Sequence, residues 1–470
     1  MPRRSSSHVP RAHFGFARDP LRITLFLLLV ITLSRIHQAL GLNALHPALL
    51  LFALAAGYAF ITPRALVESP FRRWPGRVMA ALLVLACLSA PFGISLGGSA
   101  SFILTDYIKV LVVSFLLMMV IRGTSDLSMF VMAYVVSAGV LVWMAVFIFR
   151  LQMTSEGMAR LNNMYTYDAN DLGCVLITGM PLVVLAFQTS KRRGKIVCGV
   201  ILAGLGLAIA RSGSRGAFLG LGVVGLAILV MLKEVPVPRR VAFVGAVVFA
   251  LLISAPEGYW DQMATIFQPT KDYNWTERDG RKQIWMRGLH YMWTHPVFGL
   301  GINNFGRAEG TISNLAKNFE PGDPGIRWAA PHNSFIQAGA EMGIPGLILW
   351  SSLVIGGIVA CVRIRRRLPR SWLHGDQEQR FLYLTSVYLP ISFLGFAVTA
   401  FFVSFAYLDP IYILAAYVVG LYRSVDLKLR SAAMPSVPPQ VVHRARVMGQ
   451  RGGLAIADAQ RRHPSHMLGA

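Results

Sequence analysis

Apolar residues gather along the chain in about twelve runs, most of them close to the roughly 20 residues that a helix needs to cross a bilayer. Glycines interrupt several runs, so their number is better defined than their ends. The pattern predicts an all-α, polytopic membrane protein whose transmembrane domain covers residues 23–422. The predicted spans are 23–40, 45–62, 78–97, 103–121, 127–149, 172–188, 196–210, 216–232, 240–255, 345–362, 381–400 and 407–422.

The composition agrees with this class. Hydrophobic residues make up 54% of the chain and charged residues only 14%, whereas soluble proteins average roughly 25% charged residues. The mean hydropathy is +0.53. These values exclude an ordinary soluble domain.

The net charge of +23 raises the question of a nucleic-acid partner. The positions of the basic residues argue against one. When the spans are threaded with the amino terminus inside the cell, 31 of the 45 Lys and Arg residues fall on the cytoplasmic side, as expected from the bias that orients membrane helices. We therefore expect no nucleic-acid partner, a cytoplasmic amino terminus (1–22) and a cytoplasmic, disordered tail (423–470).

The chain carries no motif for a resident metal or nucleotide. Its four cysteines lack CxxC spacing, and no GxxxxGK[ST] loop is present. Asp168 and Asp171 are not spaced as a metal clamp. Asp168 and Asn170 either line the entrance of a site or cap the sixth span. We expect no cofactor and no metal ion.

A long hydrophilic segment, residues 256–333, lies outside the cytoplasm in this topology. It carries as many acids as bases and is rich in Trp and Tyr. Within it, RKQIWMRGLHYMWTHP (281–296) predicts an amphipathic helix. Two interpretations stay open, a lid at the membrane interface and a purely structural loop. The apolar face of the helix consists of Ile284, Gly288, Tyr291 and Met292.

The stretch ARSGSRGAF (210–218) joins two apolar runs on the same outer side. Positive charge there runs against the topological trend, and arginines in such places are commonly functional. Gly and Ser let backbone N–H groups approach an anion, and Arg offers a fork that matches phosphate oxygens. Arg211 and Arg215 are therefore candidates for binding phosphate, with membrane anchoring as the alternative for each.

A polar stripe interrupts AAPHNSFIQAGAEMGIPGLILW (329–350). Asn333, Gln337 and Glu341 follow one another at i, i+4 and i+8, so they share one helix face. The stripe either lines a polar cavity or forms hydrogen bonds between helices. A short helix capped by Asn333 or Ser334 should break at GIPG, with the span proper beginning near Pro345.

His332 stands at the start of this predicted short helix. Histidine has an ordinary pKa of about 6.5, so it can accept a proton near neutrality, which arginine cannot do. The arginine turn, the aromatic loop and His332 all fall on the same outer face. An anionic substrate carried in the membrane fits this combination, and a structural role for the histidine is the alternative.

These residues resemble the motifs of one family. His332–Asn333, nine residues and then Gly343-Ile-Pro-Gly346 are similar to the H[NSQ]-x9-G-x-x-G signature of the O-antigen ligase and O-antigen polymerase superfamily. SGSRGA (212–217) resembles the arginine turn of that family, and residues 280–305 resemble its large periplasmic loop. Leu347 and Ile348 replace the two threonines of the best-known ligase signature, so the acceptor is left open.

The resemblance implies an inner-membrane glycosyltransferase that needs no metal. The donor would be an undecaprenyl-diphosphate-linked glycan and the acceptor a hydroxyl group, in the ligases that of the lipid A core. By motif position, Arg215 would bind the diphosphate, Arg281 would be the phosphate contact of the loop, and His332 would orient or deprotonate the acceptor hydroxyl. The further candidates for substrate binding are Arg211, Arg287, Asn333 and Gln337, and Arg287 could exchange roles with Arg281.

Two other functions remain open at this point. A polymerase of lipid-linked repeat units would share the fold and the chemistry. A polysaccharide-lipid flippase or transporter also often has twelve spans, but such proteins usually show two matching halves and ionisable residues at the midplane. Neither feature is found here.

Overall fold

The computed structural model describes residues 19–63, 66–154, 157–162, 164–231, 235–318 and 328–433. Residues 1–18 of the predicted amino-terminal segment, and residues 434–470 of the predicted tail, lie outside them. The chain divides into two units, Met1–Val425 and Asp426–Ala470. The architecture below is that of the first unit.

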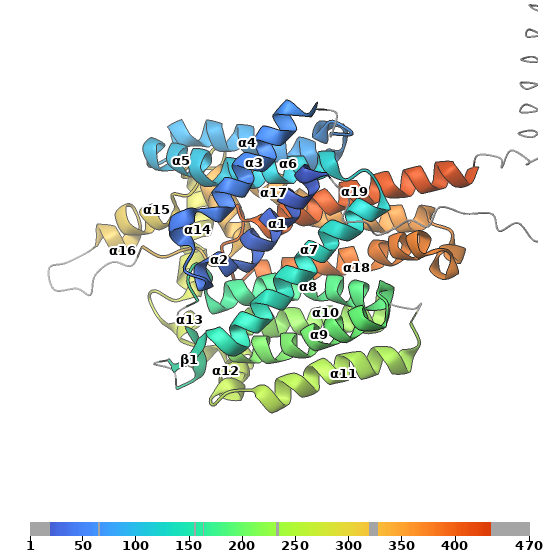
Figure 1. Cartoon of the computed structure of the whole chain (residues 1–470). Helices are drawn as coiled ribbons and strands as arrows, with labels where there is room; N and C mark the ends of the chain where they lie inside the picture. Colours follow the sequence, from blue (N-terminus) through green and yellow to red (C-terminus); the bar gives the residue numbers. More distant parts are fainter. Residues whose placement is uncertain are drawn as a thin grey trace, which may run out of the picture. The chain divides into compact units, whose positions relative to one another are not determined.

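In the described part of the chain, ten helices are long and apolar enough to cross a membrane, which confirms the all-α, polytopic architecture (Figure 1). Two shorter apolar helices, α1 (Pro20–Ser34) and α10 (Arg215–Met231), occupy the two remaining predicted spans. The long apolar segments comprise α3 (Pro47–Ile61), α4 (Trp74–Phe92), α5 (Leu96–Phe102) with π-helix η4 (Ile103–Tyr107) and α6 (Ile108–Val120), α7 (Thr124–Trp143) with π-helix η5 (Met144–Ile148), α8 (Ala169–Thr189), α9 (Arg192–Ser212), α11 (Val237–Ser254), α17 (Ser334–Arg367), α18 (Gln377–Ala400) and α19 (Asp409–Ala433).

Short helical turns connect several of these spans. They are α2 (Ile36–Ala39) and the 3-10 turns η1 (Asn43–Leu45), η3 (Pro70–Arg72) and η8 (Arg370–His374). The last helix, α19, continues to Ala433, beyond the predicted end of the final span.

Helices α8 and α18 form the centre of the helix bundle, and 83% of the apolar window of each is buried. Small residues let the neighbouring helices approach closely. Gly173 of α8 lies against Ala217 of α10, and Gly395 of α18 lies against Ile177 of α8. The predicted alternative of a helix cap is confirmed at the start of α8, where Asp168 and Asp171 form a capping box.

Helix α17 breaks where the sequence predicts. Gly343 has a φ of 70°, in the left-handed region that favours glycine, and a Cβ there would meet the carbonyl oxygen of Pro296 at 2.5 Å. The segment after α14 forms hydrogen bonds with the backbone groups that the break leaves without a helical partner. The Ile344 N–H donates to Pro296, and the Leu300 N–H donates to the Ala340 carbonyl, both at 2.8 Å.

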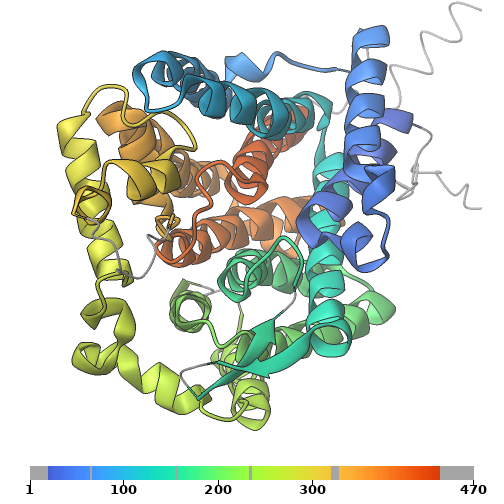
Figure 2. The same ribbon diagram turned by 90° about the vertical axis from the view of Figure 1, so that its left-hand side faces the viewer.

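The large loop folds into short helices, on the side of the first unit that Figure 2 presents. The predicted amphipathic helix is confirmed as α14, which buries Ile284, Gly288 and Tyr291 and packs against α17. The elements of the loop are α12 (Tyr259–Ala264), η6 (Thr265–Phe267), η7 (Pro269–Lys271), α13 (Tyr273–Thr276), α14 (Arg281–Thr294), α15 (Phe305–Thr311) and α16 (Asn314–Lys317).

A β-hairpin that the hydrophobic pattern did not predict follows η5. Its strands β1 (Arg150–Met153) and β2 (Ala159–Asn162) are antiparallel, with Leu151 opposite Leu161. Four residues per strand are too few for an alternating pattern to be read from sequence.

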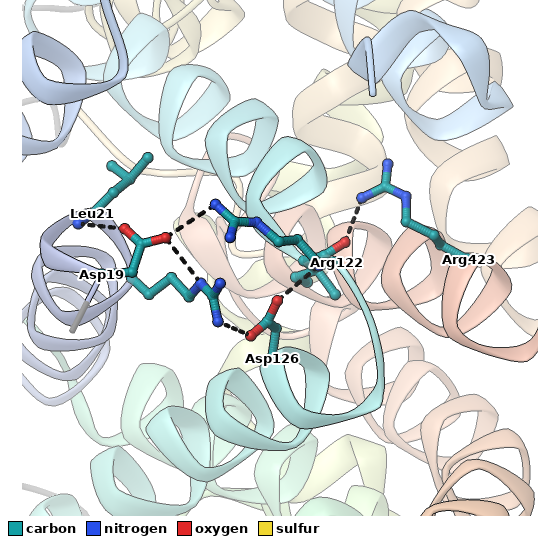
Figure 3. A network of polar contacts seen from close by, with 7 residues as sticks. Asp19, Leu21, Arg122, Asp126 and Arg423 are labelled. Carbon is teal, nitrogen blue, oxygen red and sulfur yellow. Dashed lines mark hydrogen bonds and ion pairs between the residues drawn. The ribbon is translucent and has the colours of Figure 1, made fainter. Parts of the chain in front are cut away.

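An ion-pair network ties four separate segments together, and Figure 3 shows part of it. Asp19 pairs with Arg122 at 3.1 Å, and Asp126 accepts the Arg122 backbone N–H at 2.9 Å. Arg423 pairs with Glu68 at 2.9 Å and donates to the Ile121 carbonyl, which joins this pair to the segment that contains Arg122. The segments lie before α1, after α3, between α6 and α7, and in α19. All four are predicted to be cytoplasmic, and the network gathers them at the same end of the helices.

Candidate functional site

The arginine turn connects α9 to α10. Gly213 ends α9 with a φ of 58°. The Ser214 Oγ accepts the Ala217 N–H at 3.2 Å, and α10 begins at Arg215. The local sequence explains this geometry, because glycine adopts the left-handed conformation and serine caps the next helix. Arg215 is thereby fixed at the first position of α10.

The loop holds the Arg215 side chain in place. Its Nη1 donates to the Thr265 hydroxyl at 2.7 Å and pairs with Asp272 Oδ2 at 2.7 Å. The Arg215 side chain is 12% exposed and that of Asp272 is 5% exposed. The Asn274 N–H and side-chain amide both donate to the other Asp272 oxygen at 3.0 Å. Within the described part of the chain, both contacts of the guanidinium use the same nitrogen, so the fork keeps donors for a further anion.

Arg211 is the penultimate residue of α9. Its Nη2 donates to the Phe149 carbonyl at 3.2 Å, at the end of η5. This contact links α9 to the hairpin that follows η5.

Arg281 occupies the first position of α14, and its charge interacts electrostatically with the Asp171 carboxylate at the start of α8. One turn further on, the Trp285 Nε1 donates to the Pro331 carbonyl at 3.1 Å. The beginning of α14 therefore lies within electrostatic range of the start of α8, and its first turn contacts the residue before His332.

Arg287 faces a different part of the loop. It forms a forked ion pair with Glu309 of α15, with Nε at 2.9 Å from Oε2, and Glu309 is 1% exposed. The Tyr291 hydroxyl donates to the same carboxylate at 3.0 Å. Burial, followed by the neighbouring Glu309 charge, raises the pKa of Tyr291, so its hydroxyl stays protonated and can donate. The pair fastens α14 to α15.

His332 is half-buried and has a φ of 46°, which is uncommon for a residue other than glycine. Its N–H donates to the Ser404 Oγ at 2.9 Å, in the turn between α18 and α19. Backbone held in this region by its surroundings is commonly found at functional positions.

The polar stripe both forms hydrogen bonds to neighbouring segments and lines a cavity, the two roles predicted for it. Asn333 caps α17, accepting the Phe335 and Ile336 N–H groups at 3.0 and 3.1 Å. Gln337 accepts the Ala406 N–H at 3.1 Å, and Glu341 accepts the backbone N–H groups of Asn303 and Phe305 at the start of α15. These bonds join α17 to two neighbouring segments.

Gln337 and Glu341 also line a cavity of about 470 Å³ beside His332. Its wall includes Pro331, whose carbonyl accepts from Trp285, and Ser404, whose hydroxyl accepts the His332 N–H. Burial, followed by the Glu341 carboxylate, raises the pKa of Tyr407 well above its ordinary value, so this wall residue is an uncharged hydroxyl at neutral pH. The cavity therefore combines hydrogen-bonding groups with aromatic surface. Its remaining lining residues include Phe102, Asn303, Phe305, Arg307 and Trp328.

Phe402 lies among residues that neighbour the three predicted catalytic positions. A Cβ at Gly216, next to Arg215, would lie 2.7 Å from the Phe402 side chain. The ring of Trp285 lies 6.5 Å from that of Phe402. Phe402 is two residues before the serine that accepts the His332 N–H. Arg215, the start of α14 and His332 therefore belong to the same end of the molecule.

Sequence reasoning missed the residues that hold these groups in place. Thr265 and Asp272 are fifty or more positions from Arg215, and no periodicity relates them. The turn that contains Phe402 and Ser404 lies between two apolar runs and carries no motif that marks it in the sequence. In the described residues, no group of three or more His, Cys, Asp or Glu side chains could hold a metal ion.

The fold and site thus define a polytopic membrane protein with Arg215, the start of α14 and His332 at the same end, where a polar cavity also lies. Residues 198–351 match the O-antigen ligase family model. This match, which extends from α9 to the first half of α17, confirms the predicted relationship to the O-antigen ligase and polymerase superfamily. No curated protein matches the chain.

Proposed function

We propose that the protein transfers a glycan from a membrane-borne undecaprenyl diphosphate donor to an acceptor hydroxyl, as an inner-membrane ligase facing the periplasm. The family match supports ligase-type or polymerase-type function in general. The observation that supports the finer proposal is that Gly216, next to Arg215, and Trp285 of α14 both lie against Phe402, two residues before the serine that accepts the His332 N–H.

Arg215 and Arg281 are the proposed diphosphate contacts. Arg215 is buried enough for its charge to act with little screening, and it keeps donors beyond those used on Asp272. We prefer Arg281 to Arg287 as the phosphate contact of the loop because of its position. Arg281 is one turn from Trp285, whose Nε1 donates to the Pro331 carbonyl beside His332, whereas Arg287 faces Glu309 of α15. As the bond to the sugar breaks, the leaving diphosphate gains negative charge, which positioned guanidinium groups stabilise.

An apolar crevice supports a lipid-linked donor. It has a volume of about 640 Å³ and lies between α10 and α11, with Trp260 of the loop in its wall. Phe218, also in the wall, is one turn from Arg215. A polyprenyl chain in this crevice would leave the diphosphate near the arginine turn. The wall residues between these two helices include Leu221, Leu229, Val247 and Leu251.

On the acceptor side, we propose that His332 orients or deprotonates the attacking hydroxyl. Sugar rings commonly present both hydroxyl groups and an apolar face. The adjacent cavity offers Gln337, Glu341 and Tyr407 to the first and Trp328 to the second. Arg211, Asn333 and Gln337 remain proposed substrate contacts, the last two alongside their observed hydrogen bonds.

A transfer assay tests the proposal. The purified protein is mixed with a lipid-diphosphate-linked oligosaccharide, candidate acceptors and EDTA, and released undecaprenyl diphosphate and new glycoconjugate are measured. We expect both products, and we expect Arg281→Gln to lower transfer strongly while Lys282→Gln, its exposed neighbour, leaves it nearly unchanged. If no acceptor is glycosylated but the lipid crosses vesicle membranes, the protein is a transporter.

The polymerase is the second candidate, favoured by Leu347 and Ile348 at the positions where the ligase signature has threonines. The same assay separates the two. A ligase joins the glycan to a different acceptor, whereas a polymerase produces longer glycan on the donor lipid alone.

A further inference from the structure

A second cavity, with both basic and apolar walls, lies away from the candidate site. It has a volume of about 680 Å³ and is bounded by α8, α9, α10, α11, η8 and α18. It is formed by the carboxyl-terminal end of α8 and the amino-terminal end of α18. Because α7 starts at the end that carries the ion-pair network and α8 runs back to it, the cavity belongs to that end. This is the end predicted to be cytoplasmic.

Basic side chains from three separate helices line this cavity. Lys195 comes from α9, Arg239 and Arg240 come from α11, and Arg380 comes from α18. Among the described residues, no ion pair involves any of these four cations. The carboxylate of Asp376, near Arg380 in sequence, is used to cap α18. The cavity therefore concentrates positive charge without a described counter-charge.

Arg240 provides a second, independent indication of a ligand. One of its guanidinium nitrogens donates to the Leu229 carbonyl. Its Nε is buried and has no hydrogen-bond partner in the described part of the chain. A buried N–H group without an acceptor is costly, so an anion that accepts from it would stabilise the protein.

Most of the remaining cavity wall is apolar. Val184 and Phe187 of α8, Ile228 of α10 and Leu384 of α18 form it, and the Gln188 amide donates to the Tyr388 hydroxyl at 2.6 Å across α8 and α18. A small soluble anion would satisfy the cations but leave this surface uncovered. A molecule with a phosphate group and hydrocarbon chains would match both parts.

We propose that this cavity binds an anionic phospholipid, with the phosphate of the headgroup among Lys195, Arg239, Arg240 and Arg380 and an acyl chain against the apolar wall. Basic pockets between membrane helices on the cytoplasmic side are suited to such headgroups. The bound lipid joins α8, α11 and α18. This proposal is independent of the transfer reaction, because none of its residues belongs to the catalytic end.

The test measures lipid binding by native mass spectrometry and the unfolding temperature of the purified protein in detergent. The probes are phosphatidylglycerol, phosphatidylethanolamine with the same acyl chains, and inorganic phosphate. We expect phosphatidylglycerol to bind and to raise the unfolding temperature by several degrees, and the other two to do so much less. Lys195→Gln/Arg380→Gln should weaken phosphatidylglycerol binding about thirtyfold, taking roughly 1 kcal/mol per basic side chain.

The matched control is Lys191→Gln/Arg192→Gln, which removes the same charge from exposed positions of the same end that do not line the cavity. It should keep the binding of the unchanged protein. Equal losses in both double variants would mean general attraction to a basic surface and would overturn the proposal. Equal effects of the two lipids, or stabilisation by inorganic phosphate alone, would also overturn it. If Lys195→Gln/Arg380→Gln does not fold, the exposed Lys195→Gln change alone decides between the same outcomes.

Discussion

The ion pair between Arg215 and Asp272 determines how the role of Arg215 has to be tested. Both side chains are largely buried, at 12% and 5% exposure, and their atoms lie 2.7 Å apart. Changing Arg215 to Gln alone would leave the Asp272 carboxylate buried without its partner. Breaking a buried pair in this way costs about 3 kcal/mol or more. A loss of activity in that variant would therefore have two explanations.

The double variant Arg215→Gln/Asp272→Asn separates them. It removes both charges and keeps similar shapes, so we expect the unfolding temperature in detergent to recover most of what the single variant loses. Glycan transfer should nevertheless stay about a hundred- to a thousandfold below that of the unchanged protein, the usual loss when a positioned charge donor is removed from a reaction site. Asp272→Asn alone keeps the guanidinium, so it should transfer glycan far better than either Arg215 variant.

The two measurements are made on the same purified samples. Recovery of both stability and transfer in the double variant would refute the reasoning. Arg215 would then serve to neutralise Asp272 and to hold the loop, and the diphosphate would have to be bound elsewhere.

Three further changes test the fold around the site, each by the unfolding temperature and by transfer. Gly343→Ala should destabilise the protein by more than about 1 kcal/mol, because alanine is strained at a φ of 70° and its Cβ would meet a backbone oxygen. Its control is Gly222→Ala, in open space on α10, which should not destabilise the protein. Asn333→Ala should lower the stability by about 1 kcal/mol because the cap of α17 is lost, whereas Asn333→Asp, which can still cap the helix, should retain most of that stability. Equal losses of stability in the two variants would show that the loss does not come from the cap. Arg287→Gln should destabilise the protein by about 3 kcal/mol, since Glu309 is left buried and unpaired, yet the folded fraction should still transfer glycan; a folded but inactive variant would assign Arg287 the phosphate role given to Arg281.

The fold was largely predictable because the bilayer imposes a simple rule on sequence. A span must be long, apolar and helical, so hydrophobic runs give the number and order of the helices. The break in α17 was also predictable, since Gly343 and the following proline carry it locally. The cap of α8 by Asp168 and the buried face of α14 depend on equally short spacings.

The contacts within the site were not predictable in the same way. Arg215 is held by Thr265 and Asp272, and His332 by Ser404, and each pairing joins segments that are far apart in the chain. Such contacts depend on how the loop packs against the helix ends, about which periodicity carries no information. The charge of Arg287 was visible in the sequence, but its engagement with Glu309 was not.

The central claim is that one lipid diphosphate is bound by Arg215 and Arg281 with its sugar directed toward His332. An experimental structure of the protein with an undecaprenyl diphosphate sugar tests it most directly. We predict phosphate oxygens within hydrogen-bond distance of the Arg215 guanidinium, the polyprenyl chain between α10 and α11, and the first sugar beside the cavity that Gln337 lines. A diphosphate bound away from Arg215, or a sugar that points away from His332, would contradict the account.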